Sequence, residues 1–341
     1  MDNMEFTQAL SGHTDRVWDL SWNFNGSLLA SCSGDKTVRI WSFSNSTQNW
    51  KCINVLDGKH TRTIRCVSWS PCGNYLASAG FDGVVYIEEI VSRNPLEFES
   101  TEFPTDHLHE IKSVSWSASG NYLASCARDK SVRIFDIEDI NSPYCLETIL
   151  HTQDVKSVKW HPITDILVSS SYDNTIKILK EDGEDWVEEA SLTGHLSTVW
   201  TAEFNYDGSI LASCSDDKTI RLWVPMNTEY TKWICASVLD GYHERVIFDL
   251  SWHDCTNLLA TASSDNSICI FRVDDGNSIH FGNIDNGVKV ELVTTLRNAH
   301  DEDINCCTWR PNTHGRAVLA SGSDDYQIKL WHFIDPDMPI D

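Results

Sequence analysis

Histidine, serine and aspartate recur in this chain at fixed spacing, and these three residue types could together form a hydrolytic triad. The first set is His13, Ser31 and Asp35. An aromatic residue, Trp22, follows the histidine after nine positions, and Trp41 follows the aspartate after six. A serine activated by a histidine that an aspartate orients is the arrangement of many acyl-transfer enzymes. The spacing therefore raises the question of whether the set is catalytic.

The same landmarks return seven times, which argues against catalysis. The histidines are His13, His60, His107, His151, His195, His243 and His300. The aspartates are Asp35, Asp82, Asp129, Asp173, Asp217, Asp265 and Asp325. A hydroxyl residue precedes each aspartate by four positions: Ser31, Ser78, Ser125, Ser169, Ser213, Thr261 and Ser321. A catalytic constellation occurs once in an enzyme, whereas a set repeated in register indicates a repeat architecture. We therefore predict that the chain is not an enzyme.

The elements that carry these landmarks are predicted to be strands. Segments such as VWDLSW alternate between apolar and polar residues, NFNGS and NYDGS have turn chemistry, and LASCS is a short buried run. TVRIW and CINVL supply a third and a fourth strand. Four strands in each of seven copies predict an all-β, seven-bladed β-propeller that occupies residues 1–341 as a single domain. The repeats begin near residues 12, 59, 106, 150, 194, 242 and 299.

The ends of the repeat pattern predict how the ring closes. The chain ends shortly after the third strand of copy seven, and an alternating stretch, MEFTQAL at residues 4–10, precedes the first copy. We predict that residues 4–10 form the missing fourth strand of the last blade. Residues 273–290 are rich in Asn, Gly and Asp, which predicts an exposed, solvated connector. An acidic partner-binding role for this connector stays open.

This pattern resembles the WD-repeat family over essentially the whole chain. The resemblance implies that the tryptophan indole N–H donates to the serine hydroxyl, which meets one histidine nitrogen, and that the other nitrogen meets the aspartate. The complete structural sets are His13, Ser31, Asp35 and Trp41; His195, Ser213, Asp217 and Trp223; and His300, Ser321, Asp325 and Trp331. Copies three, four and six carry Phe135, Leu179 and Phe271 in the tryptophan place, and copy two carries Glu88.

Composition excludes several function classes. The formal net charge is −24, and such a surface repels nucleic-acid phosphates, so we predict no direct nucleic-acid binding. Neither a signal sequence nor an apolar run of membrane-spanning length occurs, so no membrane association is predicted. The twelve cysteines lack C-x-x-C spacing, which predicts reduced core residues and no metal or cofactor site. We expect a cytoplasmic protein and leave a nuclear location open.

If the repeated positions maintain the fold, function depends on aligned positions that vary. Two rows are predicted to face the end of the propeller that carries the histidine and aspartate loops: the residue five after each histidine and the residue before each aspartate. The partner-binding candidates in these rows are Trp18, Arg65, Lys112, Arg128, Lys156, Tyr172, Trp200 and Phe248. Four of them are cations from copies two to four, in a chain with 26 basic and 50 acidic residues.

Cations beside aromatic rings favour a ligand that carries carboxylates. Trp, Tyr and Arg are enriched at interface hot spots, and an acidic peptide or a free C-terminus ending in an aromatic would match such a surface. Phosphate is a second ligand type. In the competing structural interpretation, the Lys and Arg stems cover the rim and the Trp rings pack against neighbouring blades.

Several stretches narrow the resemblance. SCARDKSVRIF, HTQDVKSVKWHP and EDWVEEASLTGHLSTVW are similar to the WD-repeat protein of cytosolic iron–sulfur cluster assembly. The resemblance implies a scaffold that acts late in that pathway. The implied partners are a small acidic MIP18-type protein, a HEAT-repeat protein, an iron-only-hydrogenase-like assembly factor and apo iron–sulfur client proteins. It also implies a functional role for Arg128 in CARDKS. The chain departs from the family at Glu88 and at Leu179–Lys180–Glu181, where some members have Leu-Tyr-Arg.

Two other functions compete with this scaffold. One is a different WD-repeat adaptor, such as a substrate receptor of a cullin-type ubiquitin ligase. That class often carries Trp-Asp-x-Arg after the third strand, where this chain has WSFS, FDIE, WVPM and WHFI. The other is a propeller enzyme, which would need an acid–base or metal constellation that occurs once, and none stands out in the sequence.

Overall fold

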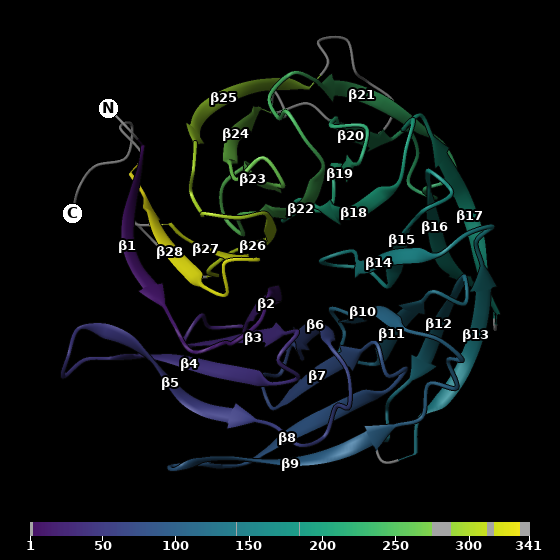
Figure 1. Cartoon of the computed structure of the whole chain (residues 1–341). Helices are drawn as coiled ribbons and strands as arrows, with labels where there is room; N and C mark the ends of the chain where they lie inside the picture. The colour runs from purple at the N-terminus through teal and green to yellow at the C-terminus, as the bar shows by residue number, and fades with distance from the viewer. Residues whose placement is uncertain (1–2, 141, 184, 275–287, 312–316, 335–341) are drawn as a thin grey trace.

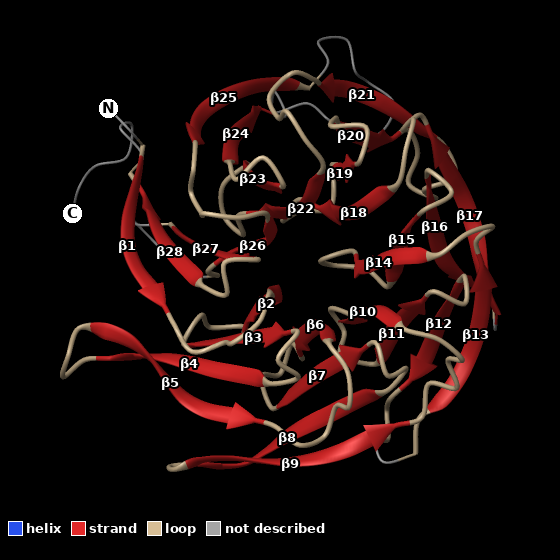
Figure 2. Cartoon of the chain, viewed as in Figure 1, coloured by secondary structure: helices blue, strands red, loops and turns tan. Residues whose placement is uncertain are grey.

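The chain folds into a ring of seven four-stranded antiparallel sheets (Figure 1). The computed structural model describes residues 3–140, 142–183, 185–274, 288–311 and 317–334. Strands joined by loops and turns make up this part of the chain (Figure 2). The predicted connector at 273–290 lies mostly outside the described residues, since 275–287 are not among them. No helix in the described part is long and apolar enough to cross a bilayer.

Each sheet is one blade, and the four strands of blades 1 to 6 follow one another along the chain. Blades 1 and 2 comprise β2 Val17–Trp22, β3 Leu28–Ser33, β4 Val38–Ser44, β5 Asn49–Leu56, β6 Ile64–Trp69, β7 Tyr75–Gly80, β8 Val85–Arg93 and β9 Leu96–Phe103. Blades 3 and 4 comprise β10 Ile111–Trp116, β11 Tyr122–Ala127, β12 Ser131–Asp136, β13 Tyr144–Leu150, β14 Val155–Trp160, β15 Ile166–Ser171, β16 Thr175–Asp182 and β17 Asp185–Thr193. Blades 5 and 6 comprise β18 Val199–Phe204, β19 Leu211–Ser215, β20 Ile220–Pro225, β21 Trp233–Leu239, β22 Ile247–Trp252, β23 Leu258–Ser263, β24 Ile268–Asp274 and β25 Lys289–Leu296. Blade 7 comprises β26 Ile304–Trp309, β27 Val318–Ser323, β28 Ile328–Phe333 and the N-terminal strand β1 Met4–Leu10.

The core lies between blades rather than inside any one of them. The first strand of each blade contacts the first strand of the next, so these seven strands surround a central channel (Figure 1). The second strands of five blades, such as β3, are buried along their whole length, and β7 and β11 are buried except at their first residue. Between blades 1 and 2, for example, Ala30 and Ile40 pack against Ile64 and Trp69. Small residues in the second strand let neighbouring twisted sheets approach closely, which explains the repeated LAS segment.

The ring is closed by the N-terminal strand, as predicted. Strand β1 pairs with β28, with Phe6 opposite Trp331 and their ring centroids 5.6 Å apart. Gln8 then links this strand to blade 1, since its amide donates to the Trp50 carbonyl oxygen at 2.9 Å and accepts from the Trp50 N–H at 2.9 Å. The all-β, seven-bladed WD-repeat propeller closed by its N-terminal strand is confirmed.

The repeated polar residues form a hydrogen-bonded network in each blade. In blade 1, His13 Nδ1 lies 2.9 Å from Asp35 Oδ2, and His13 Nε2 lies 2.8 Å from Ser31 Oγ. The Trp41 indole N–H donates to the same Ser31 oxygen at 2.9 Å. Because a carboxylate only accepts, Nδ1–H donates to Asp35, and the Ser31 hydroxyl donates to Nε2. Every buried polar atom of the set thereby finds a partner.

The other blades repeat this network, but a tryptophan completes it only in blades 5 and 7. The histidine–aspartate and histidine–hydroxyl contacts occur in all seven blades. The tryptophan contact recurs at 2.9 Å from Trp223 to Ser213 and from Trp331 to Ser321. Burial acts to raise the pKa of Asp217, but the hydrogen bonds from His195 and Thr219 lower that pKa well below its usual range. The network is therefore a structural support and leaves no free nucleophile.

Blade 2 has a glutamate, Glu88, at the position of the tryptophan. In this position Glu88 is buried and accepts a hydrogen bond from the Ser100 hydroxyl at 3.0 Å. Burial raises the pKa of Glu88, because the charged carboxylate is poorly solvated there.

We expect the substitution Ser213→Ala to lower the free energy of unfolding by about 2–4 kcal/mol, because it leaves His195 Nε2 and the Trp223 indole N–H without the hydroxyl that each one bonds. Ser170→Ala is the matched control, since Ser170 is equally buried but its hydroxyl has no partner among the described residues. Denaturant unfolding of both variants tests this. Equal losses of stability in the two variants would contradict the assignment.

We also expect deletion of residues 1–11 to lower the melting temperature by about 5 °C or more, because it exposes Trp331 and the free edge of β28. Deletion of residues 1–3, which precede β1, is the control and should change the melting temperature little. Thermal unfolding followed by circular dichroism measures both. An unchanged melting temperature in the longer deletion would refute the role of β1 in closure.

Candidate partner-binding site

The row of residues five positions after each histidine converges on one mouth of the central channel. We call the end of the ring that carries the histidine and aspartate loops the top face. The seven residues of the row line a single small hollow there: Trp18, Arg65, Lys112, Lys156, Trp200, Phe248 and Asn305. Each comes from the start of the first strand of its blade, so the propeller symmetry itself brings them together.

Cations and aromatic rings contact one another around this mouth. The guanidinium of Arg65 lies 5.2 Å from the centre of the Trp18 ring. Lys156 Nζ lies 4.8 Å from the Tyr172 ring centre and 5.1 Å from that of Trp200. Trp200 in turn meets Phe248 edge to face, with centroids 4.9 Å apart. Cation–π contacts at these distances hold the charges beside apolar surface.

Arg128 lies beside the mouth rather than in it. Its guanidinium forms an ion pair with Glu110 at 3.2 Å, and its side chain is 59% exposed. Lys112 connects it to the hollow, since Lys112 Nζ is 4.0 Å from the same carboxylate and 3.9 Å from the Phe81 ring centre. Arg62 completes this group from the neighbouring blade, at 3.3 Å from Glu110.

The row before each aspartate is used less uniformly. Tyr172 exposes more than half of its surface to solvent on the rim, and Arg128 exposes more than half of its side chain. Asp216 accepts from the Ser197 hydroxyl at 2.8 Å, and Asp324 pairs with Arg16 at 3.1 Å. In blades 5 and 7 this position therefore supports the loops of the fold.

Burial tunes the lysines of the site. It lowers the pKa of Lys112 to about 8. The Glu110 carboxylate acts to raise this pKa, and the positive charge of Lys156 acts to lower it further. Burial also lowers the pKa of Lys156. Both effects arise because water solvates these ammonium groups poorly. An incoming carboxylate would relieve this cost, so the arrangement favours anionic ligands.

Below the mouth, the channel widens into a polar cavity of about 210 Å³. Asp19, Lys159, Glu203 and Asp249 contribute its charged groups, with Lys159 Nζ 4.0 Å from Glu203. Asp19 accepts the Val67 N–H of the next blade at 3.0 Å, and Asp249 does the same for Cys307 at 2.9 Å. Burial raises the pKa of Asp249 to about 7. The two aspartates thus connect adjacent first strands.

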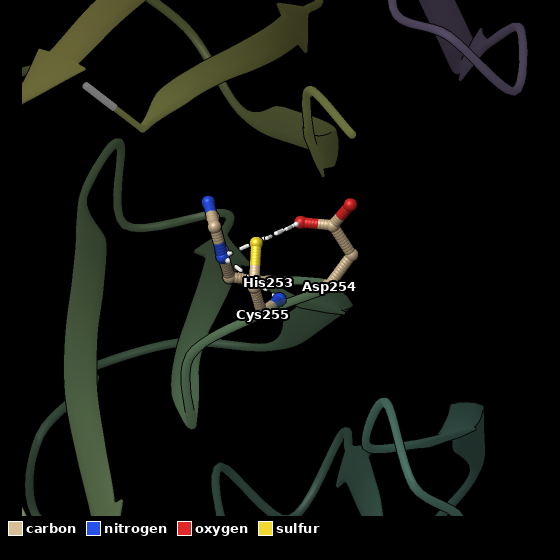
Figure 3. Close-up of side chains that lie close together, drawn as sticks. All are labelled: His253, Asp254 and Cys255. Carbon is tan, nitrogen blue, oxygen red and sulfur yellow. Dashed lines mark hydrogen bonds and ion pairs between the residues drawn. The ribbon is translucent and has the colours of Figure 1, made fainter. Parts of the chain in front are cut away.

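One turn brings three metal-ligating residue types together: His253, Asp254 and Cys255, after β22 (Figure 3). Their ligand atoms already bond one another, because Cys255 N–H donates to His253 Nδ1 at 3.3 Å and the Cys255 thiol donates to Asp254 at 3.0 Å. Burial and Asp254 raise the pKa of the Cys255 thiol to about 11. Metal ligation requires the thiolate, so an ion bound here would have to displace this proton.

The cysteines of the propeller form no disulfide bonds. All twelve are free, and seven of them are buried. Burial raises the pKa of the Cys306 and Cys307 thiols well above the ordinary value, which keeps them protonated.

Sequence reasoning missed two residues of this region, Arg62 and Glu110. Arg62 stands two positions after His60, and Glu110 stands three positions after His107, so neither belongs to the two rows considered. The signal that could have revealed them is their place in the top-face loops between blades. Residues in such loops reach across to the neighbouring blade.

Fold and repeated networks define the class of this protein. The WD domain, G-beta repeat model matches residues 4–42, 50–87, 100–136, 143–179, 186–224, 233–272 and 290–332, so the chain is a WD-repeat propeller. The Aedes aegypti protein named "Probable cytosolic iron-sulfur protein assembly protein Ciao1" is 47% identical over 98% of this chain and 99% of its own length. The homologues named in the same way are 47% identical in Chlamydomonas reinhardtii, over 95% of this chain and 96% of theirs, and 40% identical in Schistosoma japonicum, over 97% and 98%. The chain belongs to this CIAO1 family of WD-repeat proteins, which confirms the resemblance.

We expect binding of an acidic peptide to weaken about fivefold between pH 7 and about pH 9, because Lys112 loses its proton near pH 8. The variant Lys112→Arg keeps its charge in this range and should lose much less affinity. Fluorescence anisotropy of a labelled acidic peptide measures both proteins at each pH. The same pH dependence in the two proteins would show that Lys112 does not contact the ligand.

Proposed function

We propose that this protein is a non-enzymatic scaffold for the late, delivery stage of cytosolic iron–sulfur protein assembly. The observation that carries the proposal is the ring of cations and aromatic residues at the channel mouth, in a chain of the CIAO1 family. Its full-length relatives carry cytosolic iron–sulfur protein assembly in their names, which supports the pathway and a cytosolic location. The scaffold docks apo-proteins and assembly factors on its top face and blade edges.

The side chains themselves support a binding role over a catalytic one. The serine, histidine and aspartate of each repeat bond one another inside the blades, with Ser31 and Ser213 fully buried. A buried hydroxyl that already takes part in two hydrogen bonds does not reach a substrate. The groups at the mouth are half-buried cations and rings, which bind and orient partners.

The chemistry of the mouth indicates the kind of partner. Lys156 between Tyr172 and Trp200 offers a partly desolvated ammonium flanked by two rings. An acidic segment, or a chain terminus whose carboxylate follows an aromatic residue, places a negative charge on the ammonium and a ring among the rings. We propose that the partners are a small acidic MIP18-type protein, a HEAT-repeat protein, an iron-only-hydrogenase-like assembly factor and apo iron–sulfur clients.

A second candidate is another kind of WD-repeat adaptor, such as the substrate receptor of a cullin-type ubiquitin ligase. The stretches WSFS, FDIE, WVPM and WHFI do not favour it. Affinity purification of the full chain followed by mass spectrometry separates the two functions. Recovery of iron–sulfur enzymes and a MIP18-type protein supports assembly, whereas recovery of cullin adaptors supports the alternative.

We expect the charge reversal Arg128→Glu to reduce recovery of these partners about tenfold or more, because it places a second carboxylate beside Glu110 and repels an acidic partner. Arg245→Glu is the control, since Arg245 is similarly exposed on the top face, at 61%. Thermal melting of both variants establishes that the propeller is intact. Equal recovery with Arg128→Glu and with the control would argue against the top-face site.

A further inference from the structure

Three cations from two blades converge on one carboxylate beside the channel mouth. Glu110 Oε1 is 3.3 Å from Arg62, and Glu110 Oε2 is 3.2 Å from Arg128 and 4.0 Å from Lys112. The Glu110 side chain is 15% exposed, whereas those of Arg62 and Arg128 are 56% and 59% exposed. The carboxylate therefore lies beneath the two guanidinium groups, whose outer sides face solvent.

Phe81 provides the apolar side of this cluster. Its ring centre is 3.9 Å from Lys112 Nζ and 5.9 Å from the Arg62 guanidinium carbon. The Arg62 guanidinium also donates to the Phe81 carbonyl oxygen at 2.6 Å, which fixes the charged end of its side chain. These contacts restrain both cations before any ligand arrives, so binding costs less conformational entropy.

Blade 6 contains the same inter-blade contact that Arg62 makes between blades 2 and 3. Arg245 also stands two positions after its histidine, donates to the Ser264 carbonyl oxygen at 2.6 Å and pairs with Asp303 of the next blade at 3.2 Å. Arg62 and Arg245 thus share one way of joining adjacent blades. This similarity alone would make Arg62 a residue of the fold.

The two places differ in charge. In the described part of the chain, the ion pairs of Asp303 involve Arg245 alone, so that site is neutral. Glu110 is shared among Arg62, Lys112 and Arg128, which leaves two positive charges uncompensated by it. In a chain of net charge −24, such an excess is unexpected for a contact that only joins blades. The excess itself points to a negatively charged ligand.

We propose that Arg62, Lys112 and Arg128 form one anion-binding site above Glu110, and that it takes a carboxylate side chain of an acidic polypeptide partner. The inference rests on the proposed function and adds Arg62 as a residue that contacts the partner. The spacing supports a carboxylate, because Arg62 and Arg128 already hold one between them, each at a different oxygen. A second carboxylate on their solvent side would meet the outward N–H groups of the same two guanidinium groups.

The experiment compares the two equivalent arginines in the full-length chain. Binding of a fluorescein-labelled octaglutamate peptide is measured by fluorescence anisotropy at low ionic strength, where exposed ion pairs are screened least. We expect Arg62→Ala to weaken binding about tenfold and Arg245→Ala to leave it within about twofold of the wild type. Thermal melting should show similar losses for both variants, because both contacts join blades in the same way.

Three results would overturn the inference. In the first, the wild type does not bind octaglutamate. In the second, the two variants bind the peptide equally well. In the third, inorganic phosphate displaces the peptide at far lower concentrations than glutarate does. The last result would assign the site to phosphate. Recovery of partners in the Arg128→Glu experiment is a separate readout, so the proposed function and the role of Arg62 can fail independently.

Discussion

Closure of the ring by strand β1 is the contact on which the rest of this structure depends. A propeller has no core within a blade, and each sheet is stable only between two neighbours, as Ile40 and Ile64 illustrate at the first junction. Blade 7 receives its outer strand from the opposite end of the chain, with Leu10 and Met4 buried against the ring. The junction is reinforced along its depth, since Asn305 donates to the Val17 carbonyl oxygen at 3.0 Å and Gln8 bonds Trp50. Seven first strands can surround a channel, and present residues at its mouth, because this junction holds.

The repeated network maintains the fold, and the variable rows supply the side chains at the channel mouth. His, Ser or Thr, and Asp bond one another in every blade and hold the top-face loops, as when Asp35 accepts the Thr14 N–H at 3.0 Å. Loops held in this way place the next first strand at a defined height in the channel wall. The residue five positions after each histidine then varies freely, and symmetry turns seven separate positions into one ring. Function is thereby separated in the sequence from the residues that maintain the fold.

Much of this architecture could be predicted because it depends on local patterns repeated seven times. The strand pattern, the position of β1 and the convergence of Trp18, Lys156 and Trp200 all follow from the repeat register. The role of Glu110 could not, because its contacts with Arg62 and Arg128 depend on side-chain reach between loops of two blades. The contact of Glu88 with Ser100 could not be predicted for a related reason, since Ser100 lies on the fourth strand, whose register the sequence leaves undefined. Pairwise contacts between variable residues require coordinates.

The distribution of charge explains why geometry matters at this mouth. The chain carries 50 acidic and 26 basic residues, so an acidic partner is repelled by the molecule as a whole. That repulsion is screened beyond about 8 Å at physiological ionic strength, whereas contacts within the mouth are not. Arg65, Lys112 and Lys156 stand beside aromatic rings, where their charges are partly desolvated and act strongly at short range. Long-range steering therefore contributes little to such an encounter. In the proposed binding role, affinity depends on how well a partner's carboxylates and rings match the positions of these cations, and this match would provide selectivity among acidic partners.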